Sequence, residues 1–324
     1  MSYLITLQPS GHQFSAHGNE PLLEAALRAG LNLTYQCNSG SCGECKVKVL
    51  SGDYQRVRHA DYPLSELEKT QNYALMCSIA ATSDMRIEAA EAKQSEDIAE
   101  QRLTIKSAKL QPRGDHYWEL NVRTPRSQTL RFLAGQSVRF ISGQLHSRDI
   151  AVASCPCNGM NLQFHLSDDE KDIIIQRIIR GELKQWDIVG PYGEFSLDDD
   201  SQRASVFIAF DTGFAPIKSL VEHALALEKE QSMYLFWVMP KSREHYQSNY
   251  CRAWEDVFDG FVYIPMNIDY ADVEFENLAQ RIIARCPSET DIDLYLAGPA
   301  LMRNQMCAAF IERGTPVERI FIKR

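Results

Sequence analysis

The sequence has no long apolar run, no excess of basic residues and no low-complexity tract. No apolar run approaches the roughly 18–20 residues of a membrane-spanning helix, so we expect no membrane span. Its 34 Lys and Arg are outnumbered by 43 Asp and Glu, which gives a net charge of −9 and argues against nucleic acid as a partner. The start lacks the basic and apolar regions of a signal peptide. We therefore expect a cytoplasmic protein.

Catalytic arrangements of side chains are also missing. No Ser-His-Asp-like or paired-carboxylate site can be argued from the order of residues, and the 8 histidines show no metal-ligand spacing with the cysteines. The sequence therefore predicts no catalytic residue.

The pattern of apolar residues divides the 324-residue chain into three parts, within the range expected for this length. Residues 1–92 alternate short strands with one helix, which Pro21 begins and Gly30 ends. After a charged linker at 91–101, residues 102–199 show the short alternating runs of an antiparallel barrel, interrupted by one helix-like segment. Residues 203–324 alternate buried strands with helices, which predicts a doubly wound parallel sheet.

Four of the nine cysteines form the strongest motif. They are Cys37, Cys42, Cys45 and Cys77. The first three stand in a C-x4-C-x2-C run and the fourth follows later, which is the plant-type [2Fe–2S] spacing. Structural zinc is the rival, but zinc sites usually pair two short Cys-x2-Cys or similar motifs. The sequence therefore predicts an iron–sulfur cluster held by these four thiolates.

The other five cysteines are scattered. They are Cys155, Cys157, Cys251, Cys286 and Cys307. Free cysteine behaves as a small buried hydrophobe, and we expect that role for them. Cys155-Pro156-Cys157 is the exception, because its two thiols are close enough to be redox-active.

On these motifs, the whole chain resembles the three-domain reductases that feed electrons to oxygenases and to a deoxysugar dehydrase, of the CDP-6-deoxy-glucoseen reductase type. The first ninety residues look like a plant-type ferredoxin, and LAGQSVRF, GPYGEF, TGFAPIKSLVE, FWVMP and YLAGPALM resemble later parts of that family. The resemblance implies a β-grasp ferredoxin domain at 1–92, a FAD-binding-type β-barrel at 102–199 and an NAD(P)-binding-type α/β domain at 203–324.

The chain departs from this family at its flavin-contacting positions. The family holds the flavin with an Arg-x-Tyr-Ser run, and the matching residues here are Arg148, Asp149, Ile150 and Ala151. Arg148 stays a candidate flavin ligand, while the aromatic ring and the hydroxyl are replaced by aliphatic side chains. The helix start that binds the FAD pyrophosphate in the family matches the acidic residues 168–172. Carboxylates would face phosphates there.

The nicotinamide side departs in a similar way. The family's Gly-Gly-Thr-Gly loop is Phe210-Asp211-Thr212-Gly213 here, so Thr212 and Gly213 are the retained candidate nucleotide ligands. Asp211 or Thr212 would cap the helix that Pro216 begins, or Asp211 would contact ribose hydroxyls. The family's closing acidic–aromatic segment is absent, and the chain ends at residues 321–324 with FIKR.

These departures predict a one-electron carrier, in which a working cluster sits on a reductase-like body with degraded FAD and NAD(P)H sites. NAD(P)H gives up two electrons at once and a flavin is needed to split the pair, so a separate reductase would load such a carrier. The acceptor would be an oxygenase, a di-iron enzyme or a dehydrase. The alternatives are a functional NAD(P)H-dependent flavoprotein with an atypical FAD pocket, or a subunit that scaffolds or senses redox state. Whether the chain oxidises NAD(P)H by itself stays open.

Overall fold

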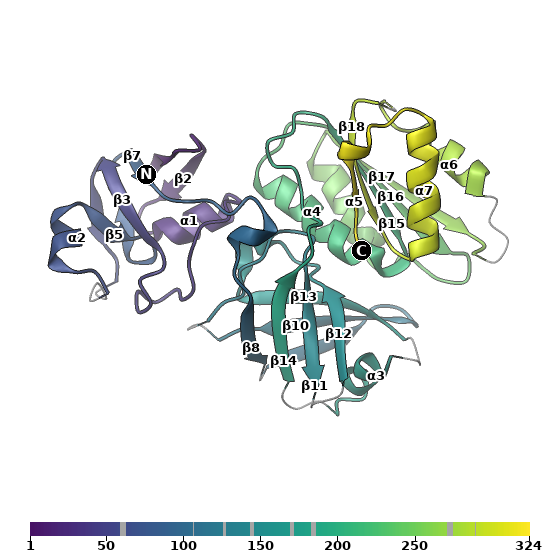
Figure 1. Cartoon of the computed structure of the whole chain (residues 1–324), viewed down its shortest axis with the longest axis horizontal. Helices are drawn as coiled ribbons and strands as arrows, with labels where there is room; N and C mark the ends of the chain where they lie inside the picture. Colours follow the sequence, from purple (N-terminus) through teal and green to yellow (C-terminus); the bar gives the residue numbers. More distant parts are fainter. Residues whose placement is uncertain are drawn as a thin grey trace.

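The computed structural model describes residues 1–58, 63–105, 107–125, 128–142, 146–168, 172–182, 186–270, 275–288 and 290–324. Three bodies follow one another along the chain (Figure 1). They comprise a small mixed sheet with its helix, an antiparallel barrel and a parallel sheet between helices. The predicted fold class is confirmed.

The first body is a five-stranded sheet of order β2-β1-β7-β3-β5, with a separate β4–β6 pair. Its elements are β1 (Ser2–Gln8), β2 (Gln13–His17), α1 (Leu22–Arg28), β3 (Lys46–Ser51), β4 (Tyr54–Arg56), α2 (Glu66–Thr70), β5 (Tyr73–Leu75), β6 (Ile79–Ala81) and β7 (Met85–Glu88). β1 and β7 are parallel neighbours although they come from opposite ends of this body. The arrangement is that of a β-grasp fold.

Helix α1 forms where the apolar spacing predicted it. Five of its seven residues are buried against the sheet. Its C-terminal end is closed by Gly30, which has a φ of +79°, and the N–H groups of Gly30 and Leu31 bond to the carbonyls of Leu27 and Ala26. This Schellman arrangement satisfies the last carbonyls of the helix and turns the chain toward the cysteine loop.

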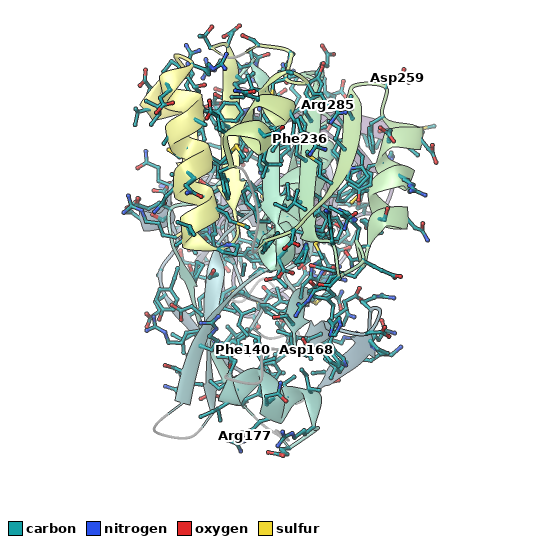
Figure 2. The ribbon with its side chains drawn as sticks, turned by 90° about the vertical axis from the view of Figure 1, so that its right-hand side faces the viewer. Phe140, Asp168, Arg177, Phe236, Asp259 and Arg285 are labelled. Atoms are coloured by element: carbon teal, nitrogen blue, oxygen red, sulfur yellow. A yellow bond between two sulfur atoms is a disulfide. The ribbon has the colours of Figure 1, made fainter. Side chains whose placement is uncertain are left out.

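The second body is an antiparallel barrel of two sheets, with orders β13-β10-β9 and β12-β11-β14-β8. Its elements are β8 (Gln101–Ile105), β9 (Ala108–Pro112), β10 (Tyr117–Arg123), β11 (Ser137–Ser142), β12 (His146–Ala151), β13 (Asn161–Ser167), α3 (Ile173–Ile179) and β14 (Trp186–Tyr192). Phe140 lies in its core, edge-on to Phe164 and Trp186 (Figure 2). The predicted linker is partly packed, because Ala92 and Ile98 are buried beside Leu133.

The third body is a five-stranded parallel sheet of order β17-β16-β15-β18-β19. Its elements are β15 (Ala204–Phe210), α4 (Phe214–Ala226), β16 (Met233–Pro240), α5 (Ser248–Val257), β17 (Phe261–Ile268), α6 (Phe275–Ile283), β18 (Ile292–Ala297), α7 (Ala300–Glu312) and β19 (Ile320–Ile322). Helices cover both faces, so there are two apolar layers. Trp237, Trp254 and Tyr263 lie in the core, as predicted. β16 and β17 are added on one side of β15, and β18 and β19 on the other. The strand order thus switches at β15, and open α/β sheets bind ligands at the carboxyl ends of the strands beside such a switch point.

Among the described residues, no helix is long and apolar enough to cross a membrane.

Candidate functional site

The four motif cysteines come together in the first body. Three lie on the loop between α1 and β3, and Cys77 lies on a short 3-10 helix, η1 (Met76–Ser78), after β5. The Sγ atoms form two pairs, with 3.0 Å between Cys37 and Cys42 and 3.3 Å between Cys45 and Cys77. Only Cys42 is partly exposed, and the other three are buried.

Backbone and hydroxyl donors surround this group of sulfurs. The N–H of Cys42 lies 3.4 Å from Cys37 Sγ, and the N–H of Glu44 lies 3.5 Å from Cys42 Sγ. The hydroxyl of Ser41 donates to Cys37 Sγ at 3.5 Å. Gly43 turns the loop with a φ of +82°, and a Cβ there would come within 3.1 Å of Pro63. The loop therefore aims donors at sulfur, which stabilises an anionic cluster.

The same contacts alter thiol acidity. Burial opposes ionisation of Cys37, but hydrogen bonds from Ser41 and Cys42 outweigh it and lower its pKa to about 5. The hydrogen bond from Cys45 lowers the pKa of Cys77 to about 6, while the pKa of Cys45 is raised by the same contact and by burial. Each pair thus contains one thiol that ionises readily, and metal binding needs thiolates.

Two pairs of thiols fit two irons better than one tetrahedral ion. A structural zinc site would bring four ligands to one centre. These four thiols would hold a [2Fe–2S] cluster, whose chemistry is the uptake and release of one electron.

One residue beside this loop was not predicted. Arg58 donates to Glu24 Oε1 at 2.8 Å and to both oxygens of Asn38, the residue after Cys37. It thereby ties the loop to α1. No local motif marks such an arginine, because its partners come from elsewhere in the sequence.

At the barrel, the retained flavin candidate Arg148 is already paired. Its Nε lies 2.9 Å from Oδ2 of Asp172. The other carboxylate oxygen, Oδ1, accepts from the N–H groups of Ile174 and Ile175, both at 3.1 Å, and so caps α3. One carboxylate thus occupies both the arginine and the helix N-terminus. Residues 169–171 of the predicted acidic stretch lie outside the described residues.

A cavity of about 370 Å³ lies where the barrel meets the third body. Ile150 and Ala151 line it from β12, and the two nucleotide candidates, Thr212 and Gly213, line it from the other side. Gly213 is in close contact with its surroundings, since a Cβ there would lie 2.4 Å from the carbonyl oxygen of Ala297. The predicted flavin and nucleotide candidates therefore border one space.

The prediction that Asp211 or Thr212 caps the helix after the nucleotide-type loop is wrong. Neither Asp211 nor Thr212 caps the helix, because α4 starts at Phe214 without a side-chain cap. Instead, Asp211 keeps a left-handed backbone (φ +52°) at a family glycine position. Its Oδ1 accepts from the hydroxyl of Tyr117 at 2.6 Å, and Arg243 donates to the same hydroxyl at 3.2 Å. The carboxylate of Asp211 is therefore bound to the barrel residue Tyr117 and does not cap α4.

Aromatic rings fill the junction behind this loop. Phe214 stacks on Trp237 with 3.8 Å between ring centroids, and Tyr117 stacks on Tyr246 at 4.4 Å. The hydroxyl of Tyr246 also lies 3.1 Å from Nδ1 of His165, whose pKa burial holds well below its usual range. The loop shape is thus supported by packing that needs no ligand.

The chain end packs at the same junction. Phe321 stacks on Tyr295 with 4.7 Å between ring centroids. Lys323 donates to the carbonyl oxygen of Gly135 at 2.8 Å, and burial lowers its pKa to about 8. The C-terminal segment is therefore held against the barrel by Lys323.

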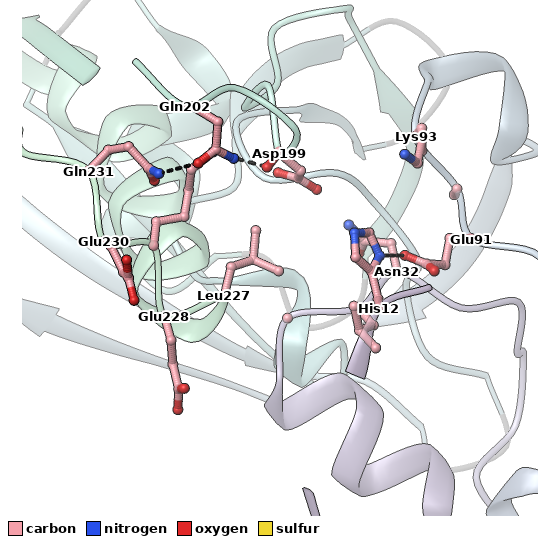
Figure 3. A pocket seen from close by; sticks show the side chains of 14 residues that line it. His12, Asn32, Glu91, Lys93, Asp199, Gln202, Leu227, Glu228, Glu230 and Gln231 are labelled. Atoms are coloured by element: carbon pink, nitrogen blue, oxygen red, sulfur yellow. Dashed lines mark hydrogen bonds and ion pairs between the residues drawn. The ribbon is translucent and has the colours of Figure 1, made fainter. Parts of the chain in front are cut away.

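The first and third bodies meet at a charged cavity of about 320 Å³ (Figure 3). His12 pairs with Glu91 on one side at 2.8 Å, and Lys93 reaches across to Asp200 at 2.7 Å. Leu227 is the apolar contact, since a Cβ on Gly30 would lie 3.0 Å from its Cδ2. This junction is lined mainly by polar and charged side chains, unlike the aromatic one.

Two of the cysteines outside the cluster motif are joined. Cys155 and Cys157 form a disulfide, with 5.2 Å between their Cα atoms. This is the pair for which the sequence left a redox-active role open, and the tight turn around Pro156 brings its sulfurs together. The structure shows no disulfide at the remaining seven cysteines.

Comparison with known proteins agrees with this domain content. The 2Fe-2S iron-sulfur cluster binding domain family matches residues 5–82, and the oxidoreductase NAD-binding domain family matches residues 207–308. A CDP-6-deoxy-L-threo-D-glycero-4-hexulose-3-dehydrase reductase from Yersinia pestis is 26% identical over 99% of this chain and 98% of its own. Reductase component 1 of a terephthalate 1,2-dioxygenase from Comamonas sp is 27% identical over 87% of this chain and 84% of its own.

Solved structures share the whole fold. A cytochrome P450 reductase from Amycolatopsis superposes with a TM-score of 0.62 at 22% identity, covering 99% of this chain and 98% of its own. The ferredoxin reductase of a carbazole 1,9a-dioxygenase gives 0.58 at 20% identity, with 99% and 98% covered. The first body is therefore a [2Fe–2S] ferredoxin domain, the third is an oxidoreductase NAD-binding domain, and the whole chain is similar to three-domain ferredoxin–FAD–NAD(P)H reductases.

Proposed function

We propose that this chain is a one-electron carrier in the cytoplasm, with domains at 1–92, 102–199 and 203–324. Its cluster ligands are Cys37, Cys42, Cys45 and Cys77. A bound [2Fe–2S] cluster takes up and gives back a single electron. The acceptor is a partner enzyme of the oxygenase, di-iron or dehydrase type, in line with the relatives' names.

The observation that carries this proposal is the carboxylate of Asp172. A flavin pyrophosphate would need Arg148 and the N–H groups at the start of α3, and Asp172 engages both. Like charges ~4 Å apart repel by about 4 kcal/mol at an effective dielectric constant of 20. Ile150 and Ala151 offer neither a ring for stacking nor a hydroxyl. We infer that these residues do not fit a tightly bound FAD.

The nucleotide loop supports the same view. The carboxylate of Asp211 adds negative charge beside the place of a pyrophosphate, and its bond to Tyr117 fixes it there. Phe210 is fully buried and contributes a side chain where a nucleotide needs close backbone approach. Thr212 and Gly213 are left as the candidate contacts for a weakly held nucleotide.

The ferredoxin domain supplies what a carrier needs. The N–H groups of Cys42 and Glu44 and the hydroxyl of Ser41 stabilise negative charge on the sulfurs. Cys42 is the partly exposed ligand, so the electron enters and leaves on its side. Residues 1–100 carry 8 Lys and Arg against 13 Asp and Glu, which suits a basic docking surface on the partner. A separate reductase would load the cluster.

A second function is favoured by the relatives, which are named as reductases. In it, the chain oxidises NAD(P)H and binds FAD through Arg148 and main-chain groups in a modified pocket. The deciding experiment is the ratio of flavin to cluster in protein purified under nitrogen. We expect two irons per chain, no FAD, and none taken up when FAD is offered in excess. About one FAD per two irons would overturn the carrier and support the reductase.

A further inference from the structure

The disulfide Cys155–Cys157 takes no part in the proposed function, yet it lies where the three domains meet. It flanks a short 3-10 helix, η3 (Pro156–Asn158). Helix α1 of the ferredoxin domain packs against η3 from one side and α4 packs against it from another. A change in the geometry of η3, which follows β12 of the barrel, would therefore alter its contacts with the ferredoxin domain and with the third domain.

Helix α4 holds the chain on the N-terminal side of the disulfide. The N–H of Cys155 donates to Glu222 Oε2 at 2.9 Å, and the hydroxyl of Ser219 donates to the carbonyl oxygen of Ser154 at 2.7 Å. Lys218, only 3% exposed, pairs with the other oxygen of Glu222 at 2.6 Å and also bonds the carbonyl oxygen of Ala153. Cys155 is thus fixed to α4 by buried polar groups.

On its C-terminal side, the disulfide is linked to the cluster loop. A Cβ on Gly159 would lie 2.8 Å from the hydroxyl oxygen of Tyr35, two residues before Cys37. The carbonyl oxygen of Gly159 accepts from Leu130 N–H at 3.3 Å, and the neighbouring Thr129 N–H donates to the carbonyl oxygen of Gln36 at 3.1 Å. A short series of contacts therefore joins the disulfide to the chain entering the cluster.

The two sulfurs differ in the way that thiol–disulfide exchange requires. Cys155 is 6% exposed, whereas Cys157 is partly exposed and open to attack. The N–H of Cys157 lies 3.2 Å from Cys155 Sγ, where it would stabilise a thiolate leaving group. The bridge also closes a very short loop, which constrains the unfolded chain little, and the structure shows no other disulfide among the nine cysteines. A purely stabilising role has little support.

We propose that Cys155–Cys157 is a redox-active disulfide that exchanges with an external dithiol, and that its reduction loosens the docking of the ferredoxin domain. A thiolate of the dithiol attacks Cys157 Sγ, forming a mixed disulfide and releasing Cys155 as a thiolate, which then takes a proton. The second thiol of the reagent attacks the mixed disulfide and releases Cys157. Two electrons and two protons pass to the cysteines, and the dithiol becomes a disulfide.

The first test uses the full-length holoprotein, purified without thiols and equilibrated under nitrogen with mixtures of reduced and oxidised dithiothreitol. Acid quenching, alkylation and peptide mass spectrometry then give the oxidised fraction of each cysteine. We expect one two-electron transition for the peptide containing residues 155 and 157, with Cys251, Cys286 and Cys307 reduced throughout. Residues 155 and 157 found as free thiols in the isolated protein would overturn the proposal.

Two variants assign the attacked sulfur. Cys155→Ser keeps the partly exposed thiol of Cys157, and Cys157→Ser keeps the buried thiol of Cys155. We expect the thiol of Cys157 to form a mixed disulfide with 5,5′-dithiobis(2-nitrobenzoic acid) at least about tenfold faster than the thiol of Cys155. Cys286→Ser is the matched control and should behave as the parent. Equal rates for the two variants would refute the assignment of Cys157.

Hydrogen exchange measures the effect on docking. On reduction, we expect amides in 33–37 and 128–131 to exchange several-fold faster, with the cluster absorbance constant. The Cys155→Ser/Cys157→Ser double variant should exchange at the reduced rate under both conditions. A reduced parent whose exchange is unchanged in both segments would refute the coupling to docking.

Discussion

The cluster loop and the flavin-facing end of the barrel keep the shapes of their family but use their polar groups differently. In the loop, four thiols face one another, and the nearby N–H groups point at sulfur. At the barrel, Arg148 and the start of α3 are bound by the chain's own Asp172. A retained fold therefore does not imply available ligands, because a side chain of the protein can take the place of the bound group.

The largest effect should come from removing a cluster ligand. We expect Cys77→Ala to lose the visible absorbance and nearly all of the roughly two irons per chain, because one iron would keep a single protein ligand. Iron assay and visible spectroscopy measure this. Cys286→Ala, which removes a thiol remote from the motif in sequence, should keep its iron. A cluster retained in Cys77→Ala would mean that another residue is the fourth ligand.

A smaller loss, of ferredoxin-domain stability and of cluster retention, should follow from replacing a glycine of the cluster loop. Gly43→Ala places a Cβ on a residue with a φ of +82° and 3.1 Å from Pro63, which costs about 1–2 kcal/mol. We expect a lower urea midpoint for the ferredoxin domain and faster cluster loss. Gly260→Ala is the control, since its Cβ would meet nothing closer than 3.7 Å. Equal midpoints for the two variants would show that the loop tolerates the strain.

At the barrel, Asp172→Ser should free Arg148 and the N–H groups at the start of α3 for a bound group, as the N–H groups of the cluster loop are free to point at sulfur. Serine keeps a side-chain cap for α3 but removes the charge that pairs with Arg148. We expect Asp172→Ser to take up FAD in equilibrium dialysis at least about tenfold more tightly, or about 1.4 kcal/mol, than the parent, whose uptake should be below detection. Asp187→Ser, which breaks the ion pair with Arg102 on the same barrel, should leave it unchanged. Parent protein that already binds FAD as tightly as Asp172→Ser would contradict the blocking role of Asp172.

The smallest effect concerns the nucleotide loop. Asp211→Gly relieves a left-handed residue but removes the acceptor for Tyr117. Because a hydrogen bond to a charged group contributes about 1.5–3 kcal/mol and the strain about 1, we expect a net loss of about 1 kcal/mol in urea unfolding. Asp211→Asn keeps an acceptor and should change less. A glycine variant more stable than the parent would mean that strain outweighs the contact.

Much of the fold could be predicted because its signals are local. The spacing of apolar residues places α1, and alternating buried strands and helices predict the parallel sheet. The prediction of a helix cap at Asp211 failed because a residue 94 positions earlier, Tyr117, competes for the same carboxylate. The short spacing of Cys155 and Cys157 left both a packing role and a redox-active role open, because composition does not say whether two nearby thiols are oxidised.

The sequence by itself determined the cluster motif, since three thiols within nine residues are brought together by one short loop. It also led to the prediction of an altered flavin site, because Ile150 and Ala151 stand at positions where the resemblance implies a tyrosine and a serine. Only the tertiary structure decided that Cys77 pairs with Cys45, that Asp172 binds Arg148, and that the 155–157 disulfide lies between domains. The physical reason is the range of the contacts: short loops fix near neighbours, whereas partners from different elements meet only when the whole chain has packed.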